Sequence, residues 1–220
     1  MKGLFNKLEA HVHMEEYFNR LTHGLGVILS VLGLFFLIYW SVLEGGLWRI
    51  FSASIYGVSL FLMYLASTLY HTFQKPRLRY IFKIIDHSAI YLLIAGSYTP
   101  FTLILIDGTW GWSIFGIIWG LAILGVVYKI FYINRYKIFS TALYLGMGWM
   151  AIFAFEPIVT KLPPFGVFWL FAGGMAYTVG VVFYAWERLP FNHAIWHIFV
   201  MGGSLSHYIL VLFYLLPFSA

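Results

Sequence analysis

Long apolar runs alternate with short polar segments along the whole chain of 220 residues. A helix needs about 20 apolar residues to cross the roughly 30 Å hydrocarbon core of a bilayer. Seven runs reach that length, and none has the alternation or the length of about 10 residues that is typical of a membrane β-strand. The pattern predicts membrane-spanning helices at Thr22–Leu43, Trp48–Thr72, Ile81–Ile106, Trp112–Ile133, Phe139–Val159, Phe165–Trp186 and His193–Leu216.

We therefore expect an all-α polytopic membrane protein with one bundle of seven helices. The composition, 62% hydrophobic and only 10% charged, excludes an ordinary soluble domain. The first run lacks a small-residue cleavage pattern, so we expect it to stay as a helix rather than act as a cleaved signal peptide. The expected division is a cytoplasmic arm at 1–21 and a membrane domain at 22–220. In the arm, Leu4, Phe5, Leu8 and Val12 indicate an amphipathic helix at the membrane interface.

The basic residues predict the orientation of the bundle. Eleven of the thirteen Lys and Arg residues lie in the arm or in the second, fourth and sixth loops, and only Arg49 and Lys161 lie on the other side. The positive-inside rule then places the N-terminus in the cytoplasm and the C-terminus outside. Because the positive residues separate apolar runs, the net charge of +5 reflects topology, and we expect membrane lipids rather than nucleic acid as partners.

Ionisable side chains within the apolar runs are costly to bury, so each marks a candidate functional position. Ser67 and His71 are four residues apart and share a face near the end of the second span. Asp86 lies near the start of the third span, and His193 and His197 lie at the start of the seventh. Since successive spans alternate in direction, all of these groups are expected at one depth, near the cytoplasm.

Three imidazoles with an open fourth position are the ligand set of catalytic zinc. The spacing of His193 and His197 directs two rings towards one ion, and the chain has no cysteine to offer instead. Calcium and magnesium prefer more oxygen ligands, and a copper site would be expected to include sulfur or a different geometry. We predict a Zn²⁺ site at His71, His193 and His197. Asp86 would bind the metal or act as general base, and Ser67 would orient a water or donate to an oxyanion.

Other polar residues have weaker signals. His23 is a candidate for the outer shell of the metal site, and His207 is expected to pack or form a hydrogen bond deeper in the last span. His87 points about 100° away from its neighbour on a helix and is interpreted as interfacial. Glu15 and Glu16 are expected to pair with basic residues at the surface.

Four motifs in order, "THGLG", "ASTLYHTF", "DHSAIYLLIAGSYTPF" and "HAIWHIFVMGGSLSHY", resemble the hemolysin III family of bacterial membrane proteins. That family is related to the progestin and adipoQ receptors, including the adiponectin receptors, and more distantly to alkaline ceramidases. The resemblance covers the chain from about Glu15 onward. It implies a seven-helix protein of the bacterial plasma membrane with a cytoplasm-facing zinc. The implied ligands are His71, His193 and His197, with Asp86 contacting the zinc-bound water and Ser67 as the helix-two serine.

Three functions stay open at this point. The first is a zinc-dependent hydrolase of a lipid amide or ester, similar to a ceramidase. The second is a cytolytic pore, to which the family name points, although so apolar a chain cannot exist as the soluble monomer from which pores usually assemble. The third is a receptor-like regulator of membrane fluidity with structural zinc. The resemblance also implies a role in membrane lipid homeostasis. A retinal protein is excluded because the last span has no lysine, and a shared helix face for His193 and His197 argues against haem. The sequence sets neither the lipid substrate nor the oligomeric state.

Overall fold

The computed structural model describes the backbone of residues 2–106 and 108–218 and the side chains of residues 12–106 and 108–218. Over this part, every regular element is a helix, which confirms the all-α prediction. The elements are α1 (Lys2–Glu44), α2 (Leu47–Thr72), α3 (Pro76–Pro100), η1 (Phe101–Ile106), α4 (Gly108–Tyr132), α5 (Lys137–Gly148), η2 (Trp149–Ala154), α6 (Phe155–Lys161), α7 (Pro164–Ala185), α8 (Asn192–Leu210) and η3 (Val211–Leu215).

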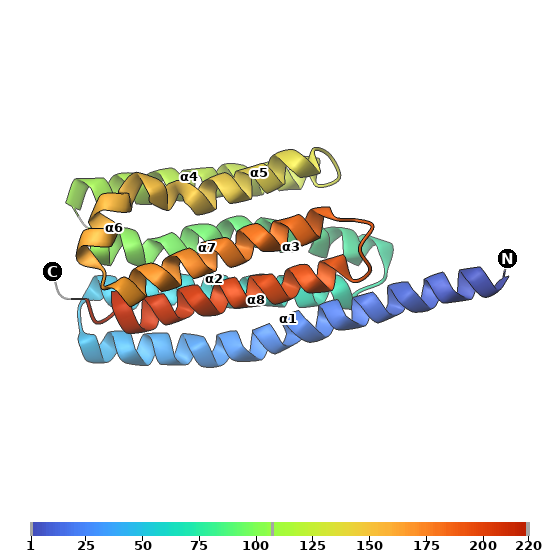
Figure 1. Ribbon diagram of the computed structural model, residues 1–220, viewed down its shortest axis with the longest axis horizontal. Coiled ribbons are helices and arrows are strands. Elements are labelled where there is room, and N and C mark those ends of the chain that lie inside the picture. The colour runs from blue at the N-terminus through green and yellow to red at the C-terminus, as the bar shows by residue number, and fades with distance from the viewer. Residues whose placement is uncertain (1, 107, 219–220) are drawn as a thin grey trace.

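Within the described residues, seven helical segments are long and apolar enough to cross a membrane. Their ends lie within five residues of the predicted spans, except at the start of the first. That helix, α1, begins at Lys2 and passes Thr22 without a break. Its first part extends beyond the bundle (Figure 1). The side chains of Leu4, Phe5 and Leu8 lie outside the described residues, and the division at residue 21 stays a prediction.

Backbone chemistry explains where several helices begin and change form. Gly45 and Gly46 have positive φ angles of 72° and 90°, which glycine adopts without steric cost, and they separate α1 from α2. Pro76 stands at the first position of α3, where its fixed φ suits a helix start. At the other end of α3, Pro100 is followed by the π-helix η1, because proline cannot continue the regular hydrogen-bond ladder.

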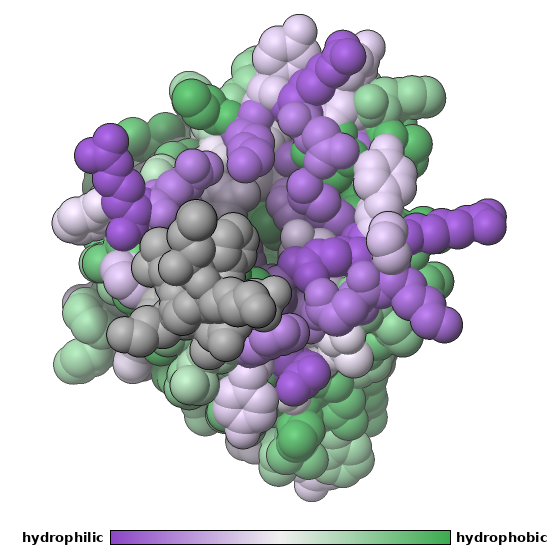
Figure 2. Space-filling model, turned by 90° about the vertical axis from the view of Figure 1, so that its right-hand side faces the viewer, coloured by the Kyte–Doolittle hydropathy of each residue, from purple (hydrophilic) through white to green (hydrophobic). Residues whose placement is uncertain are grey.

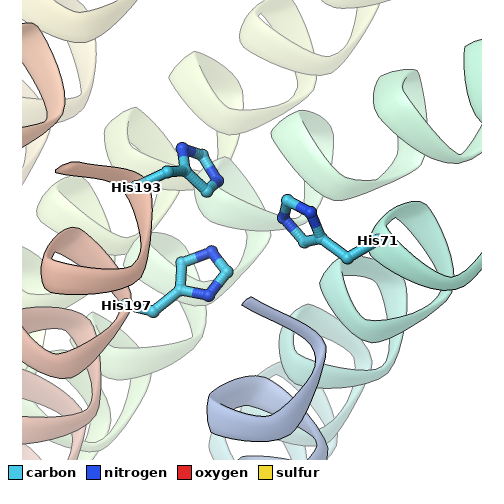
Figure 3. A group of neighbouring side chains, drawn as sticks. All are labelled: His71, His193 and His197. Carbon is cyan, nitrogen blue, oxygen red and sulfur yellow. The ribbon is translucent and has the colours of Figure 1, made fainter. Parts of the chain in front are cut away.

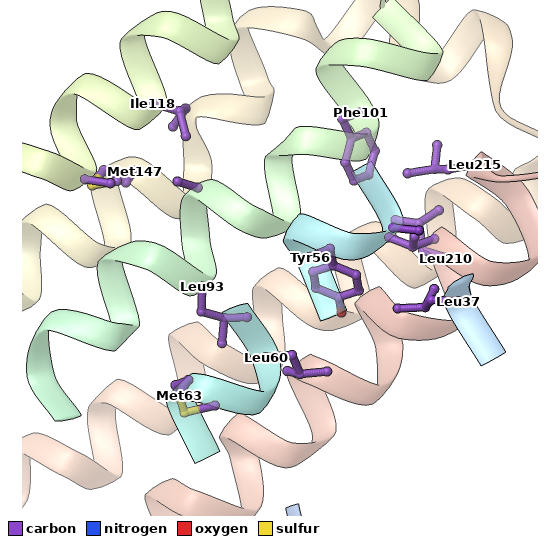
Figure 4. Close-up of a cluster of buried hydrophobic side chains, with 14 of the residues drawn as sticks. Leu37, Tyr56, Leu60, Met63, Leu93, Phe101, Ile118, Met147, Leu210 and Leu215 are labelled. Atoms are coloured by element: carbon purple, nitrogen blue, oxygen red, sulfur yellow. The ribbon is translucent and has the colours of Figure 1, made fainter. Parts of the chain in front are cut away.

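The helices run side by side along the long axis, and the two termini lie at opposite ends (Figure 1). In that view α4 and α5 lie on one side of the molecule and α1 on the other. The apolar core is filled by large buried side chains from several helices, including Leu37 of α1, Tyr56 of α2 and Leu210 of α8 (Figure 4). This packing fixes the positions of the helix ends that carry the candidate site.

Alternation of direction brings the end of α2, the start of α3 and the start of α8 to the same end as the N-terminus (Figure 1). Seen from that end, hydrophilic residues gather around a hollow (Figure 2). The polar end of the bundle is therefore the end that the sequence predicted for the functional groups. Its assignment to the cytoplasm stays a prediction.

Candidate metal centre

Three histidines from two helices meet at the polar end of the bundle. His71 lies in the last turn of α2, and His193 and His197 lie in the first two turns of α8. Each offers one nitrogen, and these ligand atoms lie within 4.8 Å of one another. The ring centroids are 4.7 to 5.2 Å apart, and the rings point towards one another (Figure 3). The structure thus brings together all three predicted ligands.

The start of α8 is fixed by its own sequence. Phe191 has a positive φ of 58°, which turns the chain sharply into the helix. The side-chain amide of Asn192 donates to the carbonyl oxygens of Phe183 and Tyr184, at 3.4 and 3.2 Å, near the end of α7. Because residues four apart share a helix face, this placement directs His193 and His197 to the same side.

Hydrogen bonds leave one ring nitrogen free on two of the three imidazoles. His71 Nδ1 lies 2.6 Å from the Glu16 Oε2 atom, and its buried Nε2 has no hydrogen-bond partner. His197 Nδ1 lies 3.3 Å from the Asn19 carbonyl oxygen and 3.2 Å from Thr22 Oγ1. An oxygen acceptor at Nδ1 holds the proton there, so both rings keep a lone pair on Nε2.

The donor set fits a divalent cation such as zinc. Zinc binds imidazole nitrogen at about 2.0–2.1 Å in a tetrahedral arrangement, which places neighbouring ligand atoms about 3.3 Å apart. The three nitrogens lie within 4.8 Å, so small ring rotations reach that separation. A buried imidazole nitrogen without a hydrogen-bond partner, as at His71 Nε2, is costly unless something binds it.

The predicted carboxylate lies beside the histidines. Asp86 of α3 is buried, with 8% of its surface exposed, and it lines the same cavity as His193 and His197. Its neighbour was expected at the interface, but His87 also lines this cavity, and His87 Nδ1 lies 3.2 Å from Asp86 Oδ2. The expectation that His87 points away from Asp86 was wrong, because an imidazole is long enough to reach back across the helix surface; its place at the interface stays a prediction.

Ser67 is buried next to a fourth imidazole. Its Oγ lies 2.7 Å from His23 Nδ1, and the buried His23 Nε2 has no hydrogen-bond partner. The His23 ring stacks on His197, with centroids 3.5 Å apart and planes at 10°. His23 therefore touches a ligand directly, whereas the predicted action of Ser67 on a water or an oxyanion stays a prediction.

Three contributors on α1, Glu16, Asn19 and Thr22, were not predicted from the sequence. Glu16 was expected at the surface, and it does accept a hydrogen bond from Arg79, but its other oxygen holds His71. A signal was present in the spacing, since Asn19 follows Glu16 by three residues, and Thr22 and His23 follow Asn19 by three and four, so that the four lie near one face of α1. Each of the four contacts a ligand histidine.

An apolar cavity leads away from the histidines into the bundle. It passes between α3, α5, α7 and α8 and is lined by Tyr144, Tyr184 and Trp196 near the site and by Trp149, Tyr177 and His207 farther in. A second cavity shares Trp149 and His207 and continues to Ile106 and Ile158, near the opposite end. As expected, His207 forms a hydrogen bond, with Nε2 at 3.2 Å from the Leu170 carbonyl oxygen. The arrangement can hold an extended apolar chain whose head lies at the histidines.

Known proteins resemble this chain over nearly its whole length. "Hemolysin-3" from Bacillus cereus is 50% identical over 203 residues, which cover 92% of this chain and 93% of that protein. "Hemolysin-3 homolog" from Bacillus subtilis (strain 168) is 49% identical over 200 residues, covering 91% and 94%. The human "Monocyte to macrophage differentiation factor" is 32% identical over 206 residues, covering 90% and 83%. No solved structure matches the chain.

The sequence profile of the family described as "Haemolysin-III related" matches residues 11–208. Together with the seven apolar helices and the relatives at about half identity, this match decides the classification. The chain belongs to the haemolysin-III related family and is an integral membrane protein.

Proposed function

We propose that the protein is a zinc-dependent hydrolase that cleaves an amide or ester bond of a membrane lipid, in the manner of a ceramidase. One observation carries this proposal: three imidazoles converge, and two of them, His193 and His197, line an apolar cavity that is also lined by the Asp86 carboxylate. The His71 Nε2 lone pair, buried and without a partner, supports a bound cation. An all-histidine nitrogen set favours zinc over the oxygen-seeking cations.

When bound, zinc supplies a Lewis acid for the scissile carbonyl and makes a coordinated water more acidic. Asp86 accepts a proton from the attacking water, because it is the carboxylate that lines the cavity beside His193 and His197. His87 Nδ1 lies 3.2 Å from Asp86 Oδ2, close enough to pair with the carboxylate. His23 and Ser67 form a buried polar pair beside His197 that can donate a hydrogen bond to the carbonyl oxygen.

The cavity determines the kind of substrate. Its walls beyond the polar end are aromatic and aliphatic, so it binds an acyl chain and leaves the scissile bond at the polar end, beside Asp86 and the histidines. Eleven of the thirteen basic residues support placing the polar end at the cytoplasmic face of a bacterial plasma membrane. The substrate would thus come from the inner leaflet, and membrane lipids are the partners.

The test is turnover of a lipid panel by detergent-purified protein, with ceramides, other lipid amides and lipid esters as substrates. D86N should keep zinc and lose about 10²- to 10⁴-fold in hydrolysis, which is the usual contribution of a general base. E156Q, at an exposed carboxylate of α6, is the matched control and should behave as wild type. Zinc-loaded wild-type protein that hydrolyses nothing in the panel would contradict the proposal and favour a regulator with structural zinc.

Cytolysis is a second candidate, since the relative from Bacillus cereus is named "Hemolysin-3". Dye release from lipid vesicles separates it from the enzyme. Leakage by the wild type that H193A leaves unchanged would support a pore that does not depend on the histidine site. Leakage that follows lipid hydrolysis and disappears in D86N would instead be a consequence of the enzymatic activity.

A further inference from the structure

Helix α1 supplies none of the three ligand histidines, yet it contacts two of them. We infer that Glu16 is a positioning residue. It orients the His71 ring and keeps the ring proton on Nδ1, which leaves Nε2 free to bind a metal, and Arg79 holds Glu16 in that place. The inference rests on the metal site proposed above. It concerns how tightly the cation is held and needs no turnover to be tested.

The Glu16 carboxylate joins three helices. Its Oε2 atom lies 2.6 Å from His71 Nδ1 at the end of α2, and its Oε1 atom accepts a hydrogen bond from Arg79 Nη2 in α3. The Arg79 guanidinium in turn lies 5.3 Å from the centroid of the Tyr70 ring, next to His71 in the chain. The Glu16 side chain is only 19% exposed, so both oxygens are committed to these contacts.

This contact has a direct chemical effect on His71. A carboxylate that accepts from one imidazole nitrogen keeps the proton there, leaves the lone pair on the other nitrogen and makes the ring a stronger ligand. The free nitrogen, His71 Nε2, is the one that is buried without a partner. Arg79 balances the charge of the half-buried carboxylate, which would otherwise be costly to keep ionised.

The same face of α1 also orients His197. The Asn19 carbonyl oxygen and Thr22 Oγ1 lie 3.3 and 3.2 Å from His197 Nδ1. Thr22 donates its own proton to the Phe18 carbonyl oxygen at 2.8 Å, which leaves its oxygen free to accept from the imidazole. Helix α1 therefore determines which ring nitrogen carries the proton in ligands from both α2 and α8. Of the three α1 residues that do this, Glu16, Asn19 and Thr22, Glu16 is the charged one.

The test is zinc affinity of the full-length protein in detergent, measured by competition with a chromogenic chelator. Removal of such an outer carboxylate usually weakens metal binding about 10- to 100-fold, and we expect this for E16A. E16Q keeps an acceptor of the same shape but loses the charge, so its zinc affinity should fall by about 10-fold, the smaller end of this range. E16D keeps the charge on a shorter side chain, so its zinc affinity should lie between those of E16A and the wild type. E15Q is the matched control, because within the described residues Glu15 contacts neither a histidine nor an arginine.

A second measurement separates positioning from a merely structural role. The thermal midpoint and helix content of the metal-free protein should be the same for E16Q and E15Q, while their zinc affinities differ. R79Q should weaken zinc binding less than E16A, and E16Q combined with R79Q should be no weaker than E16Q alone. Such non-additivity is expected when one residue acts through another.

The outcomes are distinct. Zinc binding by the wild type with equal affinity in E16A, E16Q and E15Q would overturn the role of Glu16 and leave the metal site standing. A wild type without zinc would overturn both proposals. If E16A does not purify as a folded protein, E16Q decides: an affinity equal to that of E15Q contradicts the inference.

Discussion

Two halves of the bundle are packed differently: α1 against α2, the helix that carries His71, and the helices around α5, which borders the cavity. Between α1 and α2 the backbones approach closely: a Cβ added at Gly57 would lie 2.5 Å from Leu34 Cδ1 and 3.3 Å from its Cα. In α5, a Cβ added at Gly148, which lines both cavities, would meet nothing within 4 Å, and neither would one at the exposed Gly146. Close backbone contact thus joins α1 to α2 along their length, and space remains beside α5.

Around α5, hydrogen bonds from long polar side chains join the helices in place of close backbone contact. The Tyr144 hydroxyl of α5 donates to the His87 carbonyl oxygen, and the Tyr98 hydroxyl of α3 donates to the Gly148 carbonyl oxygen, both at 2.8 Å. Lys129 of α4 donates to Ser140 of α5 at 2.7 Å. A metal site needs ligands held within a fraction of an ångström, whereas a lipid chain needs adaptable walls. These are the requirements that the proposed metal site and the proposed lipid cavity would place on the two halves of the bundle.

Removal of zinc is expected to have the largest effect on stability, and to loosen the helix ends that carry the histidines but not α5. Ligand binding stabilises the folded state by about 4 kcal/mol when the free ligand is at 1,000 times its Kd. Stripping the purified protein with a chelator should therefore lower its thermal midpoint. Hydrogen exchange should rise at the end of α2 and the start of α8 and stay constant in α5. An equal rise in all helices would contradict the division into two halves.

The next largest difference between the two halves is expected in how glycine-to-alanine substitutions change the free energy of unfolding. Gly57→Ala places a methyl group against the Leu34 backbone and side chain, and overpacking of this kind typically costs about 1–3 kcal/mol. Gly146→Ala meets open space and improves helix propensity, so the free energy of unfolding should stay constant or rise slightly. Urea or thermal unfolding in matched detergent measures both variants. Equal destabilisation would show that α5 is packed as tightly as α2.

The smallest expected effect concerns the tyrosine tether, by which we mean the two hydrogen bonds of the Tyr98 hydroxyl at the C-terminal end of α5. The Tyr98 hydroxyl donates to the Gly148 carbonyl oxygen and accepts from the Ala151 amide at 2.7 Å, and Tyr98→Phe removes both bonds. The cost should be about 1 kcal/mol, with faster hydrogen exchange at residues 148–154.

Tyr208→Phe is the counterpart of this variant on the close-packed side, where the hydroxyl donates to the Gly33 carbonyl oxygen at 3.0 Å. It should cost a similar amount in stability but leave exchange at residues 148–154 unchanged. If both variants accelerated exchange there equally, the tyrosine tether would have no local role.

Helix spans and the depth of polar groups were predictable from the sequence. Apolar length sets a span, and the alternation of direction sets which helix ends meet, so His71, Asp86 and His193 were expected at one level. The break of the fifth span into α5, the 3-10 helix η2 and α6 was not predicted, because apolar length does not report local helix geometry. The π-helices η1 and η3 were missed for the same reason.

Contacts between helices were harder to predict than their spans. The rotation of each helix about its axis decides whether Glu16 meets solvent or His71, and whether Ser67 meets the metal site or His23. A single sequence gives the face of a helix but not the partner of that face. The ligand set could be predicted from the sequence because its three members share a residue type. The groups that orient the ligands, a carboxylate, a carbonyl and a hydroxyl, have no common signature in the sequence.

Metal analysis of the detergent-purified protein tests the central claim most directly, with wild type and H193A measured side by side. Elemental analysis should find about one zinc per chain in the wild type and almost none in H193A, since two imidazoles hold zinc far less tightly than three. Wild-type protein without zinc after purification in zinc-containing medium, or H193A with the same zinc content as wild type, would contradict a metal centre at these histidines.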